Sequence, residues 1–150
     1  MKTSQQMIDL IMQWEGFRAK AYRCPSGVLT VGYGHTGAEI TPETTVTTDE
    51  ATGMLLADIR NVERCIASMS DGAGVVLTQH QFDALVSLAF NIGSTRLRRS
   101  MLWRKISINA PTDEITREFR RWVYAGGKIM PGLVKRRERE ASIYSGQGYA

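Results

Sequence analysis

The chain has 150 residues, of which 43% are hydrophobic and 23% are charged. This balance suits one globular domain that buries a real core, and the absence of a low-complexity run excludes a long disordered linker. The net charge of +4 favours an anionic partner such as nucleic acid, a membrane surface or bacterial wall polymer. Charge does not choose among these partners, and many proteins with this charge bind no polyanion.

The cysteine content and the N-terminal segment indicate in which cellular compartment the protein is made and kept. Cys24 and Cys65 are too few for a disulfide framework. Asp9 interrupts the first apolar segment and no small-residue cleavage site follows, so we expect no signal peptide. The sequence contains no run of about 18 apolar residues, so no transmembrane helix is predicted. We therefore expect a protein made and kept in the cytoplasm, with its thiols reduced.

Residues 3–14 are predicted to form a short helix. Met7, Ile11 and Trp14 share one apolar stripe, and Glu15 closes the segment on the adjoining flank. The carboxyl therefore lies at the edge of an apolar surface. Burial there disfavours the anion, which suits a proton donor that works near neutral pH. Glu15 is the candidate general acid.

Residues 21–23 and 28–33 are predicted to be two strands joined by a turn. The second strand alternates, so Leu29, Val31 and Tyr33 face a small core. Thr30, Gly32 and Gly34 are expected to face the other way. A hydroxyl among glycines, facing an acid at a helix end, describes two walls of a cleft. An ordinary hairpin with a surface Glu and Thr explains the same pattern.

The rest of the chain is predicted to be mostly helical. The small antiparallel sheet extends to about residue 47, where Thr47 and Glu50 form a predicted capping box that opens a long helix. An apolar stripe carries that helix to about residue 68. Four more helices are predicted at residues 78–91, 96–106, 113–124 and 133–144, and the first of them is the most apolar. The expected class is α+β, with a small sheet lobe and a larger helical lobe joined by the long helix.

The segment Trp14–Thr36 resembles the active-site signature of the tailed-phage lysozymes, or endolysins, of glycoside hydrolase family 24. In that family a Glu is followed after eight residues by Asp, or in some members Cys, and after five more by Thr. Here these positions hold Glu15, Cys24 and Thr30, followed by the family-like GYGHT at residues 32–36. The spacing matches without a gap.

Two further segments, Leu77–Gly93 and Phe119–Glu140, resemble the other recurring blocks of the family and follow in the expected order. The resemblance implies a single lysozyme-like catalytic domain with its active-site cleft between two lobes. The implied parts are a sheet lobe at about residues 15–47, a linking helix at about 48–68, and a helical lobe at about 1–14 and 69–150.

The same resemblance implies the reaction. The substrate would be peptidoglycan, cleaved with inversion at the β-1,4 bond between N-acetylmuramic acid and N-acetylglucosamine, for host cell lysis and phage release. Glycosidic cleavage needs a proton on the leaving oxygen, which Glu15 would supply, and Thr30 would help hold the attacking water. The resemblance also implies a monomer and a separate holin-type membrane protein that releases it to the wall. No cofactor and no metal are expected.

Cys24 stands where many relatives carry Asp. A thiol with an ordinary pKa of about 8.5 is mostly uncharged at neutral pH and stabilises a cation poorly. Either a neighbour such as Arg23 favours the thiolate, or Cys24 only shapes the site, or a thiolate nucleophile gives retention. The missing second carboxylate also keeps a lytic transglycosylase open, which would leave 1,6-anhydromuramic ends.

Four more residues are assigned roles from matching family positions. Phe90 and Ser100 correspond to positions that line the saccharide cleft in relatives, so they are expected sugar contacts, although a core aromatic explains Phe90 equally well. His35 in GYGHT is expected to support the structure by pairing with Asp58. Such a pair would raise the pKa of His35 and stabilise the fold while the ring is charged.

Two charged segments are predicted to be ordinary surface. Arg136, Arg137 and Glu140 form a cluster that is expected to be a solvated helix face, the alternative being that it braces the lobes or Glu15. The basic segment 96–105 is expected to be a common amphipathic helix, although it would also suit a weak contact with the anionic envelope or with nucleic acid.

Three other function classes stay as alternatives. A cysteine-dependent wall amidase or peptidase would use Cys24 with His35 or His80, but no nucleophile-at-helix-start pattern surrounds Cys24. A metal site would need Cys65 as well, and these four residues lack paired-ligand spacing. A nucleic-acid-binding module would depend on segment 96–105 alone, so no nucleic acid partner is expected.

Overall fold

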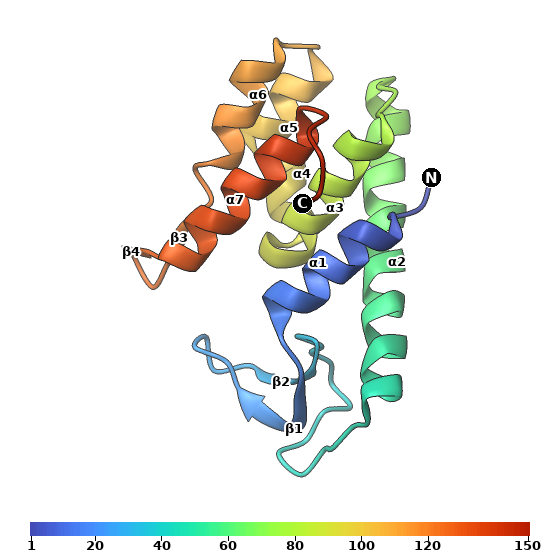
Figure 1. Ribbon diagram of the computed structural model, residues 1–150, viewed down its shortest axis with the longest axis vertical. Helices are drawn as coiled ribbons and strands as arrows, with labels where there is room; N and C mark the ends of the chain where they lie inside the picture. Colours follow the sequence, from blue (N-terminus) through green and yellow to red (C-terminus); the bar gives the residue numbers. More distant parts are fainter. The chain divides into compact units, whose positions relative to one another are not determined.

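The computed structural model describes residues 1–150 and contains seven helices and two small antiparallel sheets (Figure 1). The predicted α+β class is confirmed. The chain divides into two compact units, one made of Ile8–Asn61 and the other of Met1–Met7 with Val62–Ala150. Helices α1 (Gln5–Glu15) and α2 (Thr48–Ala73) each contribute to both units. None of the helices is long and apolar enough to span a membrane.

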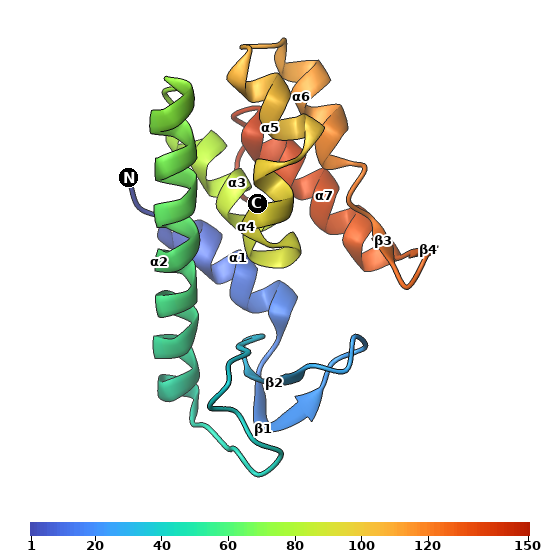
Figure 2. The ribbon, with the colours of Figure 1, turned by 180° about the vertical axis from the view of Figure 1, so that it is seen from behind.

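The unit Ile8–Asn61 is built around a hairpin of β1 (Arg18–Arg23) and β2 (Leu29–Gly32), which Figure 2 shows from behind. Tyr22 pairs with Thr30 in an antiparallel register, and an irregularity follows between Arg18 and Tyr22. Val31 is fully buried in a small core that also contains Ile40, Val46 and Ala51. Leu29 and Tyr33 pack against this core, as predicted. The prediction that Gly32 faces the other way is wrong, because a Cβ at Gly32 would lie 2.9 Å from the Cβ of Ala51 in the same core.

Helix α2 begins with the predicted capping box. The backbone N–H of Glu50 donates to the Thr47 hydroxyl at 3.1 Å, and the backbone N–H of Thr47 donates to the Glu50 carboxylate at 3.0 Å. This exchange satisfies two amide groups that an open helix end leaves unpaired. Leu55 and Ile66 on the predicted apolar stripe are buried, and the helix continues to Ala73.

The other unit has α3 (Gln79–Ile92) at its centre. A capping box between Thr78 and Gln81 opens this helix, and every side chain from Phe82 to Ala89 is buried. Helix α7 (Pro131–Tyr144) lies beside α3 in both views, and α6 (Thr112–Phe119) packs against α7 (Figures 1 and 2). The prediction that the most apolar helix forms the core of the larger part is therefore confirmed.

The predicted helix 96–106 is wrong in one respect, because it is two helices. These are α4 (Ser94–Arg98) and α5 (Met101–Ser107), and Ser100 lies between them as the N-cap of α5. Its hydroxyl accepts the backbone N–H of Trp103 at 3.0 Å, which starts a new helix instead of continuing the old one.

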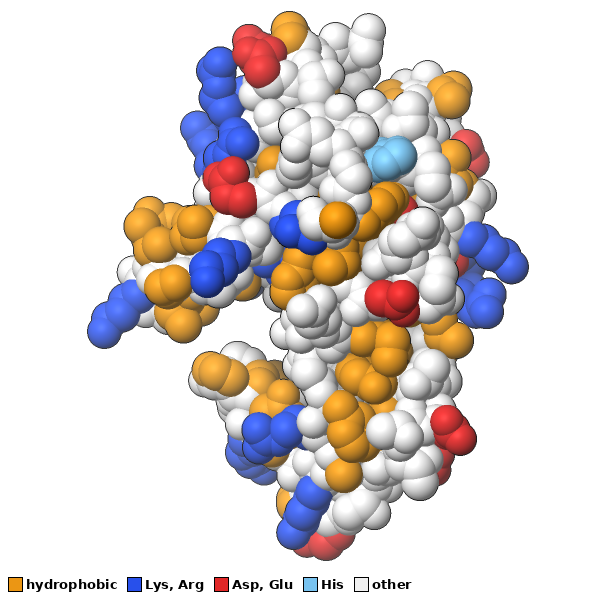
Figure 3. All heavy atoms as spheres, in the orientation of Figure 1, with side chains coloured by type: hydrophobic (Ala, Val, Ile, Leu, Met, Phe, Trp, Pro, Cys, Tyr) orange, Lys and Arg blue, Asp and Glu red, His pale blue; other side chains and the backbone are white.

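The predicted helix 113–124 is also wrong at its end. Helix α6 ends at Phe119, and a hairpin follows, formed by β3 (Tyr124–Ala125) and β4 (Lys128–Ile129). Gly126 and Gly127 form its two-residue turn with φ of 58° and 77°, which glycine adopts without strain. Tyr124, Ile129 and Met130 are exposed, and Figure 3 shows hydrophobic side chains gathered over this hairpin.

Candidate active site

Glu15 is the last residue of α1 and is half-buried. The backbone of Gly34 packs directly against its carboxyl, because a Cβ at Gly34 would lie 2.5 Å from Glu15 Oε1. Gly34 also has a backbone φ of 76°, a conformation that residues with a Cβ atom rarely adopt. The structure therefore brings Glu15 and the GYGHT segment into contact, and glycine is required at the point where they meet.

Cys24 lies at the tight turn between β1 and β2. Its backbone N–H donates to the Val28 carbonyl at 3.0 Å, and its Sγ lies 2.8 Å from the Ser26 hydroxyl. The Ser26 hydroxyl and backbone N–H hydrogen-bond the sulfur and lower the pKa of Cys24 to about 7. At neutral pH a large fraction of Cys24 is therefore thiolate, in contrast to an ordinary thiol.

The neighbour that favours the thiolate is Ser26, whereas Arg23 makes a different contact. The Arg23 guanidinium donates through Nη1 to the Gly27 carbonyl at 2.9 Å. Thr30 adds a smaller contribution to the lowered pKa of Cys24, which places these two predicted site residues beside each other. Sequence reasoning missed Ser26, although a hydroxyl two residues after a thiol in a turn is a recognisable arrangement.

Thr30 is buried on β2, and its hydroxyl donates to the Val28 carbonyl at 3.0 Å. The hydroxyl has a single proton, which can point either to this carbonyl or to the sulfur of Cys24. The oxygen keeps lone pairs that can accept a hydrogen bond from a water molecule. The side chain is therefore oriented by its own strand and remains an acceptor.

His35 lies between two carboxylates. Its Nδ1 is 2.8 Å from Asp58 Oδ2 on α2, and its Nε2 is 2.8 Å from Glu39 Oε1 in the following loop. Partial burial opposes the charged ring, but hydrogen bonds to Glu39 and Asp58 outweigh it and raise the pKa of His35 above its usual range. Asp58 was predicted as the partner, whereas Glu39 was missed despite standing four residues after His35.

Phe90 and Ser100 belong to the unit that contains α3. Phe90 is half-buried near the end of α3. The Ser100 hydroxyl donates to the Leu97 carbonyl at 2.6 Å while it accepts the Trp103 N–H, so it serves first as a helix cap. Their assignment as sugar contacts stays a prediction.

The charge cluster of α7 is buried, so the prediction of a solvated helix face is wrong. Arg137 and Glu140 are completely buried, and Arg136 is 4% exposed. The Glu140 carboxylate lies 2.8 Å from Arg137 Nε and 3.2 Å from Arg136 Nε. Ser87 on α3 donates its hydroxyl to Glu140, and Asn91 accepts from Arg137 Nη2 at 2.8 Å. These α3 residues each add one hydrogen bond to the buried charges.

The sequence matches the Phage lysozyme family over residues 12–140. The chain belongs to the phage lysozyme family. It is 37% identical over 147 residues to the endolysin of Bacillus phage PZA, an alignment that covers 97% of this chain and 55% of that one. It is also 37% identical over 148 residues to the endolysin of Acyrthosiphon pisum secondary endosymbiont phage 1, covering 96% and 98% of the two chains.

A solved structure agrees with this phage lysozyme assignment. The muramidase domain of SpmX from Asticaccaulis excentricus has a TM-score of 0.84 and 30% sequence identity, and the match covers 95% of this chain and 97% of that one. The predicted lysozyme-like fold is confirmed. The chain spans about half the length of the Bacillus phage relative but nearly the whole length of the aphid-symbiont phage endolysin.

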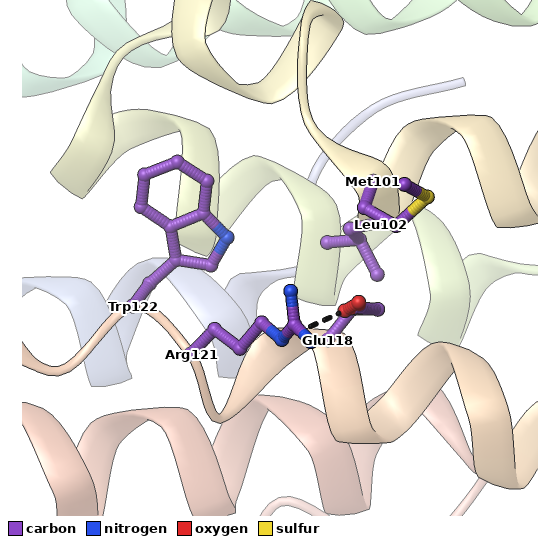
Figure 4. Close-up of a pocket in the computed structure, with 5 residues that line it drawn as sticks. All are labelled: Met101, Leu102, Glu118, Arg121 and Trp122. Atoms are coloured by element: carbon purple, nitrogen blue, oxygen red, sulfur yellow. Dashed lines mark ion pairs between the residues drawn. The ribbon is translucent and has the colours of Figure 1, made fainter.

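The chain also has a pocket of about 200 Å³ that sequence reasoning missed. Figure 4 shows Trp122 across from Met101 and Leu102, with Arg121 paired to the buried Glu118 at 3.3 Å between them. None of the predicted site residues lines it. No group of three or more His, Cys, Asp or Glu side chains is placed to hold a metal ion, and both cysteines are free thiols.

Proposed function

We propose that this protein is a peptidoglycan hydrolase, an endolysin that cleaves the β-1,4 bond between N-acetylmuramic acid and N-acetylglucosamine and so lyses the host cell. The observation that carries the proposal is the contact between Glu15 at the end of α1 and Gly34 of the GYGHT segment. Membership of the phage lysozyme family and the likeness to endolysins support it.

Glu15 is the proposed general acid. Cleavage of a glycosidic bond requires a proton on the leaving oxygen and stabilisation of an oxocarbenium-like centre. Glu15 would deliver the proton, since its carboxyl is half-buried and is held from one side by the Gly34 backbone. The attacking water would release a proton to solvent, and the Glu15 carboxylate would take one up from solvent before the next turnover.

Cys24 and Thr30 are proposed to act on the sugar cation and on the water. With a pKa of about 7, Cys24 would carry a partial negative charge near neutral pH and so replace, in part, the carboxylate of other family members. Thr30 donates to the Val28 carbonyl, so its oxygen would accept a hydrogen bond from the attacking water and orient it.

Glu15→Gln tests the central assignment. The amide keeps the size of the side chain but cannot donate a proton to the leaving group, so the wall-lysis rate is expected to fall by about 100-fold or more. Asp9→Asn is the matched control, because Asp9 is an exposed carboxylate on the same helix, and it should keep nearly full activity. A fully active Glu15→Gln variant would contradict the assignment of Glu15 as the general acid.

Cys24→Asp and Cys24→Ala separate the roles of the thiol. If Cys24 stabilises the sugar cation by charge, the Asp variant should keep activity and the Ala variant should lose most of it. If Cys24 only shapes the turn, both variants should be similarly active. If the wild type is active and the Cys24→Asp variant is inactive, the result would instead favour a thiolate nucleophile.

A lytic transglycosylase is the second candidate, and the absence of a second carboxylate at position 24 favours it. Such an enzyme needs one acid/base group and expels the glycan through an internal ring. Mass spectrometry of the released muropeptides separates the two reactions, because hydrolysis leaves reducing muramic acid and transglycosylation leaves 1,6-anhydromuramic acid.

Release to the wall is a further proposal. We infer that the protein acts as a monomer, accumulates in the cytoplasm and reaches the peptidoglycan after a separate holin-type membrane protein permeabilises the membrane. Expression in a Gram-negative host with and without a holin tests this route. Lysis that needs no holin would contradict it, and sedimentation of the purified protein tests the monomer.

A further inference from the structure

We propose that His35 is a positioning residue for Glu15, because it is held as an imidazolium between Glu39 and Asp58 and thereby keeps Gly34 against the Glu15 carboxyl. The inference rests on the proposed function of Glu15. It goes beyond a stabilising pair of His35 with Asp58, since it adds Glu39 as a second anchor and gives both anchors a role in the reaction.

The two contacts of the ring require its charged form. Nδ1 lies 2.8 Å from Asp58 and Nε2 lies 2.8 Å from Glu39. A neutral imidazole carries one N–H, so it can donate to only one of these carboxylates, and its other nitrogen would face the second with a lone pair. Both short contacts exist together only when both ring nitrogens donate.

The backbone carries the position of His35 to Gly34. The backbone N–H of His35 donates to the Val31 carbonyl, and the N–H of Val31 donates to the His35 carbonyl, both at 2.9 Å. These bonds close a tight turn that contains Gly34, whose backbone contacts Glu15. Val31 of β2 fixes one end of this turn, and His35 is its other end. We infer that the orientation of the His35 ring therefore determines how firmly Gly34 is held against Glu15.

Glu39 is held in place for this contact. Its carboxylate folds back over Gly37, where any side chain would collide with it. The hydrogen bond from His35 lowers the pKa of Glu39, which favours the charged carboxylate at neutral pH. The charged groups that face this segment are Glu39 on its own loop, Asp58 on α2 and Glu15 at the end of α1.

The arrangement predicts an alkaline limit for catalysis. Below the folded-state pKa of His35 both anchors are engaged, and as pH rises through that value one of the two bonds is lost. Gly34 is then less firmly held, so kcat should fall. KM should change little, because Glu39 and Asp58 affect where the Glu15 carboxyl lies and are not proposed to contact the substrate.

Glu39→Gln is the main test. It keeps the size of the side chain but removes one of the two charges that stabilise the imidazolium. The alkaline limb of the kcat–pH profile on purified peptidoglycan should therefore move to lower pH. Gly37→Ala should move it in the same direction with every charge retained, because the new methyl group displaces the flexible Glu39 carboxylate.

The control and the direct readout come from the same chain. Glu43→Gln removes an exposed charge from the same segment and should leave the profile unchanged. His35 and His80 are the only histidines, so NMR of the imidazole signals follows His35 directly, with His80→Gln identifying the other. Cys24 has a pKa of about 7 and titrates as well, but its contacts are retained in every variant, so its contribution is common to all of them.

The proposal predicts that the NMR midpoint of His35 and the alkaline limb of kcat move together in Glu39→Gln and in Gly37→Ala. A His35 midpoint that moves while the limb stays fixed would overturn it, as would a midpoint that does not move at all. A wild type that cleaves no glycan at any pH is a different result, which would overturn the proposed function itself.

Discussion

Replacing Glu140 by Gln tests how the buried charges hold α7 to α3. The amide occupies the same space but removes the anion that Arg136 and Arg137 share in the core. Removing one partner of a buried pair costs about 3–5 kcal/mol, because the remaining charge keeps its desolvation penalty without the compensating attraction. In a chain of this size each kcal/mol corresponds to roughly 2–4 °C, so Tm should fall by about 6–20 °C.

A second ion pair, formed by Glu138 on the same helix with Arg120 at the end of α6, provides the matched control. Glu138 lies 2.7 Å from Arg120 Nε, but its side chain is 52% exposed, so Glu138→Gln should cost less than about 1 kcal/mol. Urea unfolding of the three proteins, followed by circular dichroism at neutral pH, measures both effects. Equal losses in the two variants, or a loss below about 1 kcal/mol in Glu140→Gln, would refute the reasoning.

Three further changes test other contacts. Asp58→Asn should lower the free energy of unfolding by about 1.5–3 kcal/mol near neutral pH, where His35 is charged. The difference should become smaller as pH rises through the folded-state pKa of His35, and identical urea-unfolding profiles across pH would exclude the pair. Ser26→Ala should raise the pKa of Cys24 from about 7 toward the ordinary thiol range, and the pH dependence of alkylation in a Cys65→Ser background measures it. Ser100→Ala should cost about 0.5–2 kcal/mol in thermal unfolding, since it removes the N-cap of α5; no loss would mean that the cap is dispensable.

Local signals in the sequence were sufficient for much of the fold. The reciprocal hydrogen bonds of Thr47 and Glu50 need only three residues of spacing, so the start of α2 could be predicted. The apolar side chains of β2 that face the core could also be predicted, because such side chains repeat every two residues along a strand. Both features depend on neighbours in the chain.

The errors arose where competing local signals or distant residues decide the structure. A basic, apolar segment continues helical periodicity through Ser100, and only its side-chain bond to Trp103 shows that a new helix begins there. Gly126 and Gly127 indicate a break, but they do not reveal that the flanking residues pair as strands. The helix that was extended to residue 124 therefore missed a hairpin.

The buried cluster of α7 shows a limit of a different kind. Arg136 and Glu140 have the four-residue spacing of an ordinary surface pair. Hydrogen bonds from α3 help these charged side chains to be buried. Ser87 lies 53 residues before its partner Glu140, and Asn91 lies 46 residues before its partner Arg137. Nothing in the local sequence distinguishes this arrangement from a solvated helix face.

The family-like spacing of Glu15, Cys24 and Thr30 gives the candidate site in outline, and the roles of these residues stay predictions. Two residues that set its electrostatics were missed. Ser26 lowers the pKa of the thiol, and Glu39 shares the His35 ring with its predicted partner. Both act through side-chain directions in turns, which spacing alone does not give.

The most direct test of the account is mass spectrometry of muropeptides released from purified peptidoglycan by the wild type and by Glu15→Gln. In water enriched in heavy oxygen, the wild type should release reducing-end muramic acid that carries the heavy isotope, and Glu15→Gln should release almost none. Anhydromuramic ends without the isotope would contradict hydrolysis, and no glycan cleavage by the wild type would contradict the proposed function.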